Sequence, residues 1–165
     1  MIIPLKVYFF AGGQRAIANL LIRSKELKIF APVEAIVDTG SPLTILGGND
    51  IKKFRISSLA LNKLESRKEP VGLGGGEVKT KILDNTNIKI GSYLECDMPI
   101  QVVVENVSGK PQPTVLGVDF LIKNKLSLFF NPDKRVAYFE KEDENLDNSQ
   151  NNQIINQTPL LVQSV

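Results

Sequence analysis

A carboxylate set between two apolar runs constrains what this chain can fold into more than any other feature. In the stretch EAIVDTGSPLTILG, residues 34–47, Asp38 follows three apolar residues and precedes a short polar loop and a second apolar run. Moving an ionised carboxylate away from water without a partner is costly. Asp38 therefore either lies in a harmless surface turn or is held in a pocket because it does chemistry. The apolar flanks favour a position at the end of a buried strand.

Apolar segments along the chain are short, and glycine or proline turns separate them. Their β-branched and aromatic residues predict strands, whereas the stretch 50–65 allows either a short helix or a mixed structure. Residues 114–126 run from an apolar strand into the one helix that we expect. Many short strands with such turns are typical of a small barrel or sandwich. The expected strands cover 4–10, 15–24, 26–38 and 43–48, a pair within 87–104 joined at 91–92, and a hairpin over 127–140 that turns at 131–134.

Length and composition indicate one globular domain followed by a tail. The chain has 165 residues, of which 42% are hydrophobic and 23% charged, an ordinary composition for a globular protein. We place the domain at 1–140. Residues 141–165 are acidic and rich in Asn and Gln, so we expect this tail to be disordered apart from its apolar end.

Several classes of function are disfavoured by what the chain lacks. A net charge of only +2 gives no reason to expect nucleic acid as a partner. The absence of histidine excludes Ser-His-Asp and Cys-His catalysis and removes the commonest zinc ligand. The single cysteine, Cys96, fits a reducing compartment, and no apolar run reaches the ~18–20 residues of a membrane span. We interpret residues 1–15 as a first strand and not as a signal peptide, and we expect a cytoplasmic protein with no membrane contact.

A second segment of interest is rich in glycine. The stretch VGLGGGEV, residues 71–78, holds four glycines within 72–76, so its backbone can bend sharply and approach a ligand closely. A phosphate-binding loop would open a helix, and a P-loop would end in Lys followed by Ser or Thr. The residues that follow, EVKTKI, alternate as a strand does. This context favours a flexible hairpin tip.

The third segment, TVLGVDFL at 114–121, predicts a core strand that turns into a helix at Gly117. Packing alone explains this element, whatever the protein does. Asp119 lies two residues beyond Gly117, and we expect it to cap the helix.

Taken together and in this order, the three segments resemble the retropepsin-like aspartic proteases. The matching pieces are IVDTGS at 36–41, VGLGGG at 71–76 and VLGVDFL at 115–121. The segment 127–140 is similar to the terminal hairpin of the cellular members, so the resemblance spans roughly residues 4–140. It implies an all-β fold, a retropepsin-like acid-protease barrel with one short C-terminal helix, assembled as a symmetric homodimer.

The resemblance also implies a reaction, the hydrolysis of peptide bonds between hydrophobic residues by an aspartic endopeptidase. The family builds its site from two Asp-Thr/Ser-Gly loops that meet at a twofold axis. This chain holds one such loop and we expect no internal repeat, so each chain of a homodimer would contribute one Asp38. Two carboxylates about 3 Å apart share a proton, so one can activate a water as general base while the other acts as general acid. The implied partners are a polypeptide substrate and a second copy of the chain, with no metal and no cofactor.

The neighbours of Asp38 take their roles from the same resemblance. Thr39 would cross-link the two loops through its hydroxyl, and Gly40 would donate its N–H toward the carboxylate. The hydroxyl of Ser41 would also donate to the carboxylate, which favours the charged form, so we predict an acidic optimum. The flap, which closes over an extended substrate, would consist of Val71, Gly72, Leu73, Gly74, Gly75 and Gly76, and the strand-to-helix element would contain Leu116 and Gly117.

Two other interpretations stay open. A protein of this fold can bind peptides without cutting them, as a catalytically silent peptide-binding or dimerisation module; its partner binding would survive Asp38→Ala. A β-barrel binding module with a coincidental Asp-Thr-Gly is the other interpretation, and a strict monomer in solution would favour it.

Overall fold

The structure of the chain is a computed structural model, and its description covers residues 1–10, 12–67, 71–73, 76–106 and 112–141. These residues form eleven strands and three short helices, so the predicted all-β class is confirmed. The helices are α1 (Gly48–Lys53), α2 (Ser58–Asn62) and α3 (Val118–Asn124). The strands are β1 (Ile2–Phe10), β2 (Gly13–Ser24), β3 (Ile29–Val37), β4 (Ile45–Leu46), β5 (Glu65–Ser66), β6 (Val71–Leu73), β7 (Gly76–Ile90), β8 (Leu94–Asn106), β9 (Val115–Leu116), β10 (Leu126–Asn131) and β11 (Val136–Lys141).

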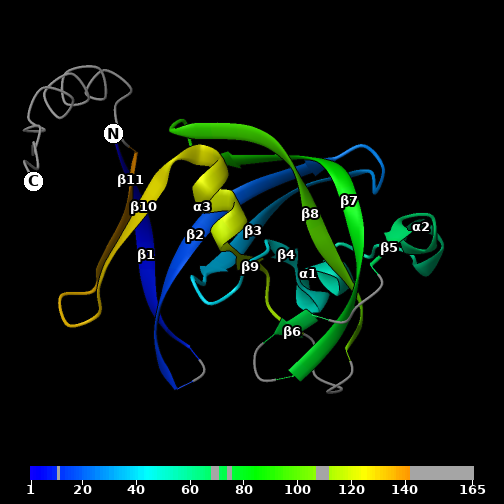
Figure 1. Ribbon diagram of the computed structural model, residues 1–165, viewed down its shortest axis with the longest axis horizontal. Helices are drawn as coiled ribbons and strands as arrows, with labels where there is room; N and C mark the ends of the chain where they lie inside the picture. Colours follow the sequence, from blue (N-terminus) through cyan, green and yellow to red (C-terminus); the bar gives the residue numbers. More distant parts are fainter. Residues whose placement is uncertain (11, 68–70, 74–75, 107–111, 142–165) are drawn as a thin grey trace, which may run out of the picture.

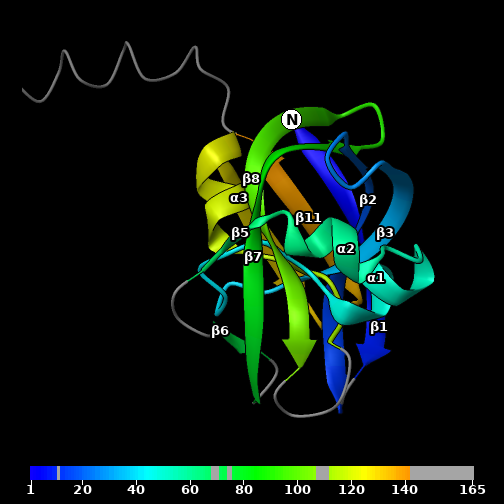
Figure 2. The same cartoon turned by 90° about the vertical axis from the view of Figure 1, so that its right-hand side faces the viewer.

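One sheet contains all the strands of the described residues. Its order is β10-β11-β1-β2-β3-β9-β4-β8-β7-β5, with β6 paired to β7 and a further pairing between β2 and β7. The long strands β2, β3, β7 and β8 curve around one another, and α3 lies beside β8 in both views (Figures 1 and 2). The sheet therefore folds back on itself and encloses a core.

Strand β1 links the two ends of the described chain. Its first residues, from Ile2 to Leu5, pair with β11, and the residues from Lys6 to Phe10 pair with β2. As a result the N-terminal strand and the C-terminal hairpin form a three-stranded part of the sheet, in the order β10-β11-β1. The predicted tail beyond β11, residues 142–165, lies outside the described residues.

The core anchors α3 on the C-terminal hairpin. Buried residues alternate with more exposed ones along β3 and along β2 from Ala18 onward, as expected for a sheet with one face against a core. Phe120 of α3 and Phe139 of β11 are fully buried, and their ring centroids lie 6.4 Å apart. Burying a Phe side chain contributes about 1.5–3 kcal/mol. This contact fixes α3, and with it the turn that connects α3 to β9.

Two helices lie where the sequence left the structure open. The stretch 50–65 allowed a short helix or a mixed structure, and the structure has α1 and α2 within 48–62; the expected C-terminal helix is α3. The hydroxyl of Ser57 caps α2 by accepting a hydrogen bond from the backbone N–H three residues later (3.2 Å). The side chains of Ile51 in α1 and Leu61 in α2 are buried. The strand expected at 43–48 is reduced to β4 because α1 follows directly.

Two short segments of the same pattern, TILG at 44–47 and TVLG at 114–117, cross within the sheet. Strand β4 pairs in parallel with β8, and β9 pairs in parallel with β3. The two short strands meet antiparallel at Ile45 and Val115. This four-residue similarity contains no second Asp-Thr-Gly, so it leaves the expectation of one such loop per chain unchanged. It could have been found by aligning every apolar-apolar-glycine triplet of the chain together with the residue before it.

Candidate active site

Asp38 follows β3 directly, and β9 holds its backbone in place. The N–H of Ile36 donates to the carbonyl of Thr114 (3.0 Å), and the N–H of Asp38 donates to the carbonyl of Leu116 (3.1 Å). These bonds continue the parallel ladder in which Val37 lies opposite Leu116. Because Val37 and Leu116 are buried, the backbone of Asp38 is tied to the core.

The loop after β3 turns tightly around the carboxylate. The N–H of Gly40 donates to Oδ1 of Asp38 (2.9 Å), the hydrogen bond that the sequence predicted, and the N–H of Ser41 donates to the Asp38 carbonyl (3.1 Å). A Cβ at Gly40 would lie 3.1 Å from the same Oδ1, so glycine suits this position. Asp38, Thr39 and Gly40 are exposed in the single chain. Asp38 therefore lies at the end of a buried strand, as expected, and the core ends at Val37.

Ser41 makes a different contact from the one predicted. Its hydroxyl donates to the carbonyl of Leu43 (2.8 Å) and not to the Asp38 carboxylate. A serine hydroxyl has one proton to donate, so this bond replaces the predicted one. Ser41 is buried, and its carbonyl accepts from the N–H of Val118 (2.9 Å). Ser41 thus braces the loop against the start of α3.

The strand-to-helix element lies against the Asp38 loop, and both residues predicted for it, Leu116 and Gly117, make this contact. Leu116 supplies the carbonyl that holds Asp38, and Gly117 is the N-cap of α3. The N–H of Gly117 donates to Oγ1 of Thr44 (3.1 Å). A Cβ at Gly117 would overlap the backbone of Leu43, so only glycine allows the two segments to cross this closely.

Asp119 has a larger role in the site than the helix cap that the sequence predicted. The N-cap is Gly117, and Asp119 is the second residue of α3. Its carboxylate accepts from the N–H of Thr44 (2.9 Å), from the hydroxyl of Thr44 (2.7 Å) and from the N–H of Phe120 (2.7 Å). The bonds to Thr44 join residues 75 positions apart. No local sequence pattern predicts such a pair; the only signal in the sequence was that two segments of the same pattern each begin with a threonine.

The glycine-rich segment forms the expected hairpin. Strand β6 pairs antiparallel with the start of β7, in a register that sets Leu73 opposite Gly76 and Val71 opposite Val78. Gly74 and Gly75, two residues of the predicted flap, lie outside the described residues. This hairpin and the turn end of the β1–β2 pair extend from the same side of the molecule (Figures 1 and 2).

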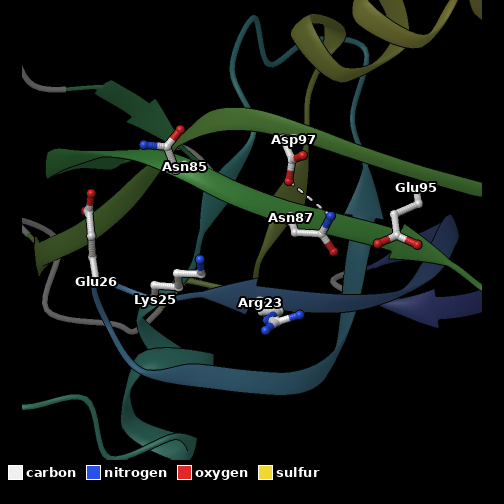
Figure 3. A pocket seen from close by; sticks show the side chains of 7 residues that line it. All are labelled: Arg23, Lys25, Glu26, Asn85, Asn87, Glu95 and Asp97. Carbon is white, nitrogen blue, oxygen red and sulfur yellow. Dashed lines mark hydrogen bonds between the residues drawn. The ribbon is translucent and has the colours of Figure 1, made fainter.

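A separate hollow of about 640 Å³ lies on β2, β7 and β8 and does not include Asp38. Its walls mix basic, acidic and amide side chains, and Nδ2 of Asn87 donates to Oδ1 of Asp97 (3.0 Å) inside it (Figure 3). A lining of both charges favours neither an anion nor a cation as ligand. The lining residues are Arg23, Lys25, Glu26, Asn85, Asn87, Glu95 and Asp97.

Neither a metal site nor a reactive thiol adds to the Asp38 loop. Within the described ranges, no three His, Cys, Asp or Glu side chains gather closely enough to hold a metal ion. Cys96 is half-buried, and burial raises the pKa of its thiol. Nδ2 of Asn124 donates to the Cys96 sulfur (3.5 Å). The thiol therefore stays protonated and packs as a small apolar group.

Solved structures resemble this fold. A retropepsin-like aspartic protease from Rickettsia conorii superposes with a TM-score of 0.54 at 16% sequence identity, over 86% of this chain and 92% of that chain. The fold of this chain is retropepsin-like. The retroviral protease-like domain of Ddi1 from Leishmania major also matches, with a TM-score of 0.44 and 14% identity over 78% of this chain and 97% of that domain.

Sequence comparison adds no further relative. No protein-family model matches the chain, and no curated protein matches it. The likeness is therefore one of fold, and the retropepsin-like fold predicted from the three motifs is confirmed. In the part of the chain that the structure describes, none of the helices has the length and apolar character to cross a membrane.

Proposed function

We propose that the chain is an aspartic endopeptidase that hydrolyses peptide bonds between hydrophobic residues. The observation that carries this proposal is the state of Asp38 in a retropepsin-like fold. Its backbone is tied to β9 and its Oδ1 accepts from Gly40, while the carboxylate stays exposed. A carboxylate that is oriented but still open to water can bind and activate a nucleophilic water. Structural carboxylates, by contrast, have their oxygens occupied by protein donors.

The reaction needs a second Asp38, which a second copy of the chain would supply. Two adjacent carboxylates hold one proton between them. The ionised one takes a proton from water as the water oxygen attacks the peptide carbonyl carbon, and the protonated one donates to the carbonyl oxygen. As the tetrahedral intermediate collapses and its C–N bond breaks, the leaving nitrogen takes the proton that the first carboxylate received from water. The second carboxylate takes back a proton from a hydroxyl of the intermediate, which restores the starting state of the pair. Thr39, exposed beside Asp38, would bond the two loops together.

The two edges of the sheet differ in a way that supports pairing of two chains. Strand β10 is the last strand in the order, spans six residues and contains neither proline nor a charged side chain. Its Phe129 is 44% exposed and stacks on Tyr138 of β11 with ring centroids 4.7 Å apart. The opposite edge, β5, has two exposed residues, one of them Glu65. An apolar edge strand without charges is a template for pairing with another chain, so β10 is the edge that we propose for the homodimer.

The β6–β7 hairpin is proposed as the flap that covers the substrate. An extended polypeptide can add to a hairpin as a further strand through backbone hydrogen bonds. Side chains on either side of the cleaved bond would then enter apolar pockets, which selects large hydrophobic residues. The proposed reaction uses no cofactor or metal. Since the one cysteine makes no disulfide within the chain, we also propose a reducing, cytoplasmic location.

The test is cleavage of an unbiased peptide mixture by the purified chain from about pH 3 to 7, read by mass spectrometry. Asp38→Asn is the control, because it keeps the size of the side chain and removes the ionisable group. The molar mass is measured in the same samples by light scattering. Cuts between bulky apolar residues at acidic pH that vanish with Asp38→Asn support the proposal.

Two results would contradict it. A dimer that binds peptides and cuts none of them would be the catalytically silent module. A strict monomer without cleavage would show that the Asp-Thr-Gly of this chain does not form a dyad.

A further inference from the structure

We propose that Asp119 is a positioning residue that sets the place of the Asp38 carboxylate through Thr44. This inference rests on the proposed function, because it assigns Asp119 a share in the rate of the same reaction. Asp119 itself does not touch the reacting atoms; it acts on the loop that carries them.

The loop between Asp38 and Thr44 is held along its length by the strand-to-helix element. At its start, the N–H of Asp38 donates to the carbonyl of Leu116 (3.1 Å). Further on, the N–H groups of Val118 and Asp119 donate to the carbonyls of Ser41 (2.9 Å) and Pro42 (3.2 Å). At its end, the Asp119 carboxylate receives both donors of Thr44. Asp119 is therefore the side chain of this element that clamps the far end of the loop.

The clamp needs a carboxylate and not merely a polar group. Three donors converge on the two oxygens of Asp119, namely the N–H and hydroxyl of Thr44 and the N–H of Phe120. An amide has one oxygen and one NH2 group, so Asp119→Asn turns an NH2 toward at least one donor. Thr44 is buried, with 1% of its surface exposed, so water cannot replace the lost acceptor. The end of the loop must then shift.

The other crossing segment provides a matched control. The hydroxyl of Thr114 donates to Oδ2 of Asp50 (2.6 Å) and accepts from the N–H of Gly47 (3.0 Å). Thr114 is as buried as Thr44, and Asp50 is half-buried like Asp119. This second clamp repeats the chemistry of the first but does not hold the loop between Asp38 and Thr44. Asp50→Asn therefore removes a similar carboxylate from a similar contact without releasing that loop.

The experiment compares Asp119→Asn with Asp50→Asn in the full chain, at a temperature where circular dichroism shows both to be folded. A misplacement of about 1 Å can cost 10²-fold in rate, so we expect Asp119→Asn to lower kcat at least tenfold with little change in KM. Asp50→Asn should stay within about twofold of wild type in both constants. Partial unfolding would also lower the apparent kcat without changing KM, so kcat is calculated from the folded fraction that circular dichroism gives for each variant.

A second readout does not depend on activity. Hydrogen exchange of the Gly40 and Ser41 amides reports on the loop, and neither amide contacts Asp119. We expect faster exchange at both in Asp119→Asn and no change in Asp50→Asn.

The outcomes separate this inference from the proposed function. If wild type cleaves peptides and Asp119→Asn matches it, or if both variants lose kcat alike, the positioning role is wrong while the protease stands. If wild type cleaves nothing, the proposed function fails, and the exchange rates then decide whether Asp119 holds the loop.

Discussion

The segments 44–47 and 114–117 share a sequence pattern and a hydrogen-bond pattern, yet only one of them continues a loop that carries a candidate catalytic group. In each, a buried threonine hydroxyl bonds a carboxylate and accepts the N–H of the glycine in the other segment. The residue before Thr44 ends a loop that begins at Asp38, whereas Gln112 and Pro113 precede Thr114. The two segments therefore serve the fold in the same way. The proposed peptide hydrolysis depends on the Asp38 loop, which precedes only the segment 44–47.

The largest loss of stability is expected from substitutions where the two segments touch. A Cβ at Gly117 would overlap the backbone of Leu43, and a Cβ at Gly47 would overlap the backbone of Gln112 and Pro113. Backbone cannot turn aside as a flexible side chain can. We expect Gly117→Ala and Gly47→Ala each to lower the free energy of unfolding by about 3 kcal/mol or more, measured by urea denaturation.

The control for the glycine variants is Gly13→Ala. A Cβ there would approach only the guanidinium end of Arg15, which can move, so we expect a change within about 0.5 kcal/mol. If Gly117→Ala were as stable as Gly13→Ala, the crossing would be looser than its hydrogen bonds indicate.

An intermediate loss of stability is expected when either of the two threonine hydroxyls is removed. Thr44→Val and Thr114→Val keep the side-chain shape but leave the N–H of the opposing glycine, buried in both segments, without its acceptor. We expect each to cost about 1–3 kcal/mol of stability, while only Thr44→Val should also reduce peptide cleavage. Thr44→Ser and Thr114→Ser retain the hydroxyl and serve as controls. Equal losses of cleavage from the two Val variants would mean that the segment 114–117 matters to the active site as much as the segment 44–47.

Sequence reasoning succeeded where the structure is local. The hairpin predicted at 127–140 is β10–β11, and the pair predicted within 87–104 corresponds to the end of β7 and most of β8. The glycine-rich hairpin and the turn from β9 into α3 were also expected. Alternating side chains and turn residues determine such elements within about twenty residues. The position of Asp38 at the end of β3 followed from the same local pattern.

The missed features depend on distant partners. Helices α1 and α2 have six and five residues, too few for propensity to identify, and packing of Ile51 and Leu61 stabilises them. The carboxylate of Asp119 accepts from Thr44, 75 positions away, a donor that only the folded crossing brings near. Ser41 is the exception, because its hydroxyl bonds a carbonyl only two residues away, that of Leu43. A motif names the groups at a site, but it does not say which of several neighbours each group will bond.

The smallest loss of stability is expected from Ser41→Ala. This variant also tests directly which neighbour the Ser41 hydroxyl bonds. The Ser41 hydroxyl donates to the carbonyl of Leu43, so its loss should cost about 1 kcal/mol of stability. Because it makes no bond to the Asp38 carboxylate, the acidic limb of the cleavage rate against pH should stay where it is in wild type. Leu43→Ala, which keeps the accepting carbonyl, controls for loosening of the loop. A shift of the limb by about one pH unit, equal to 1.4 kcal/mol between the two protonation states, would mean that assembly or substrate turns the hydroxyl toward Asp38. In that case the site of the active form would differ from that of the single chain, and Ser41 would belong with the dyad and not with the scaffold.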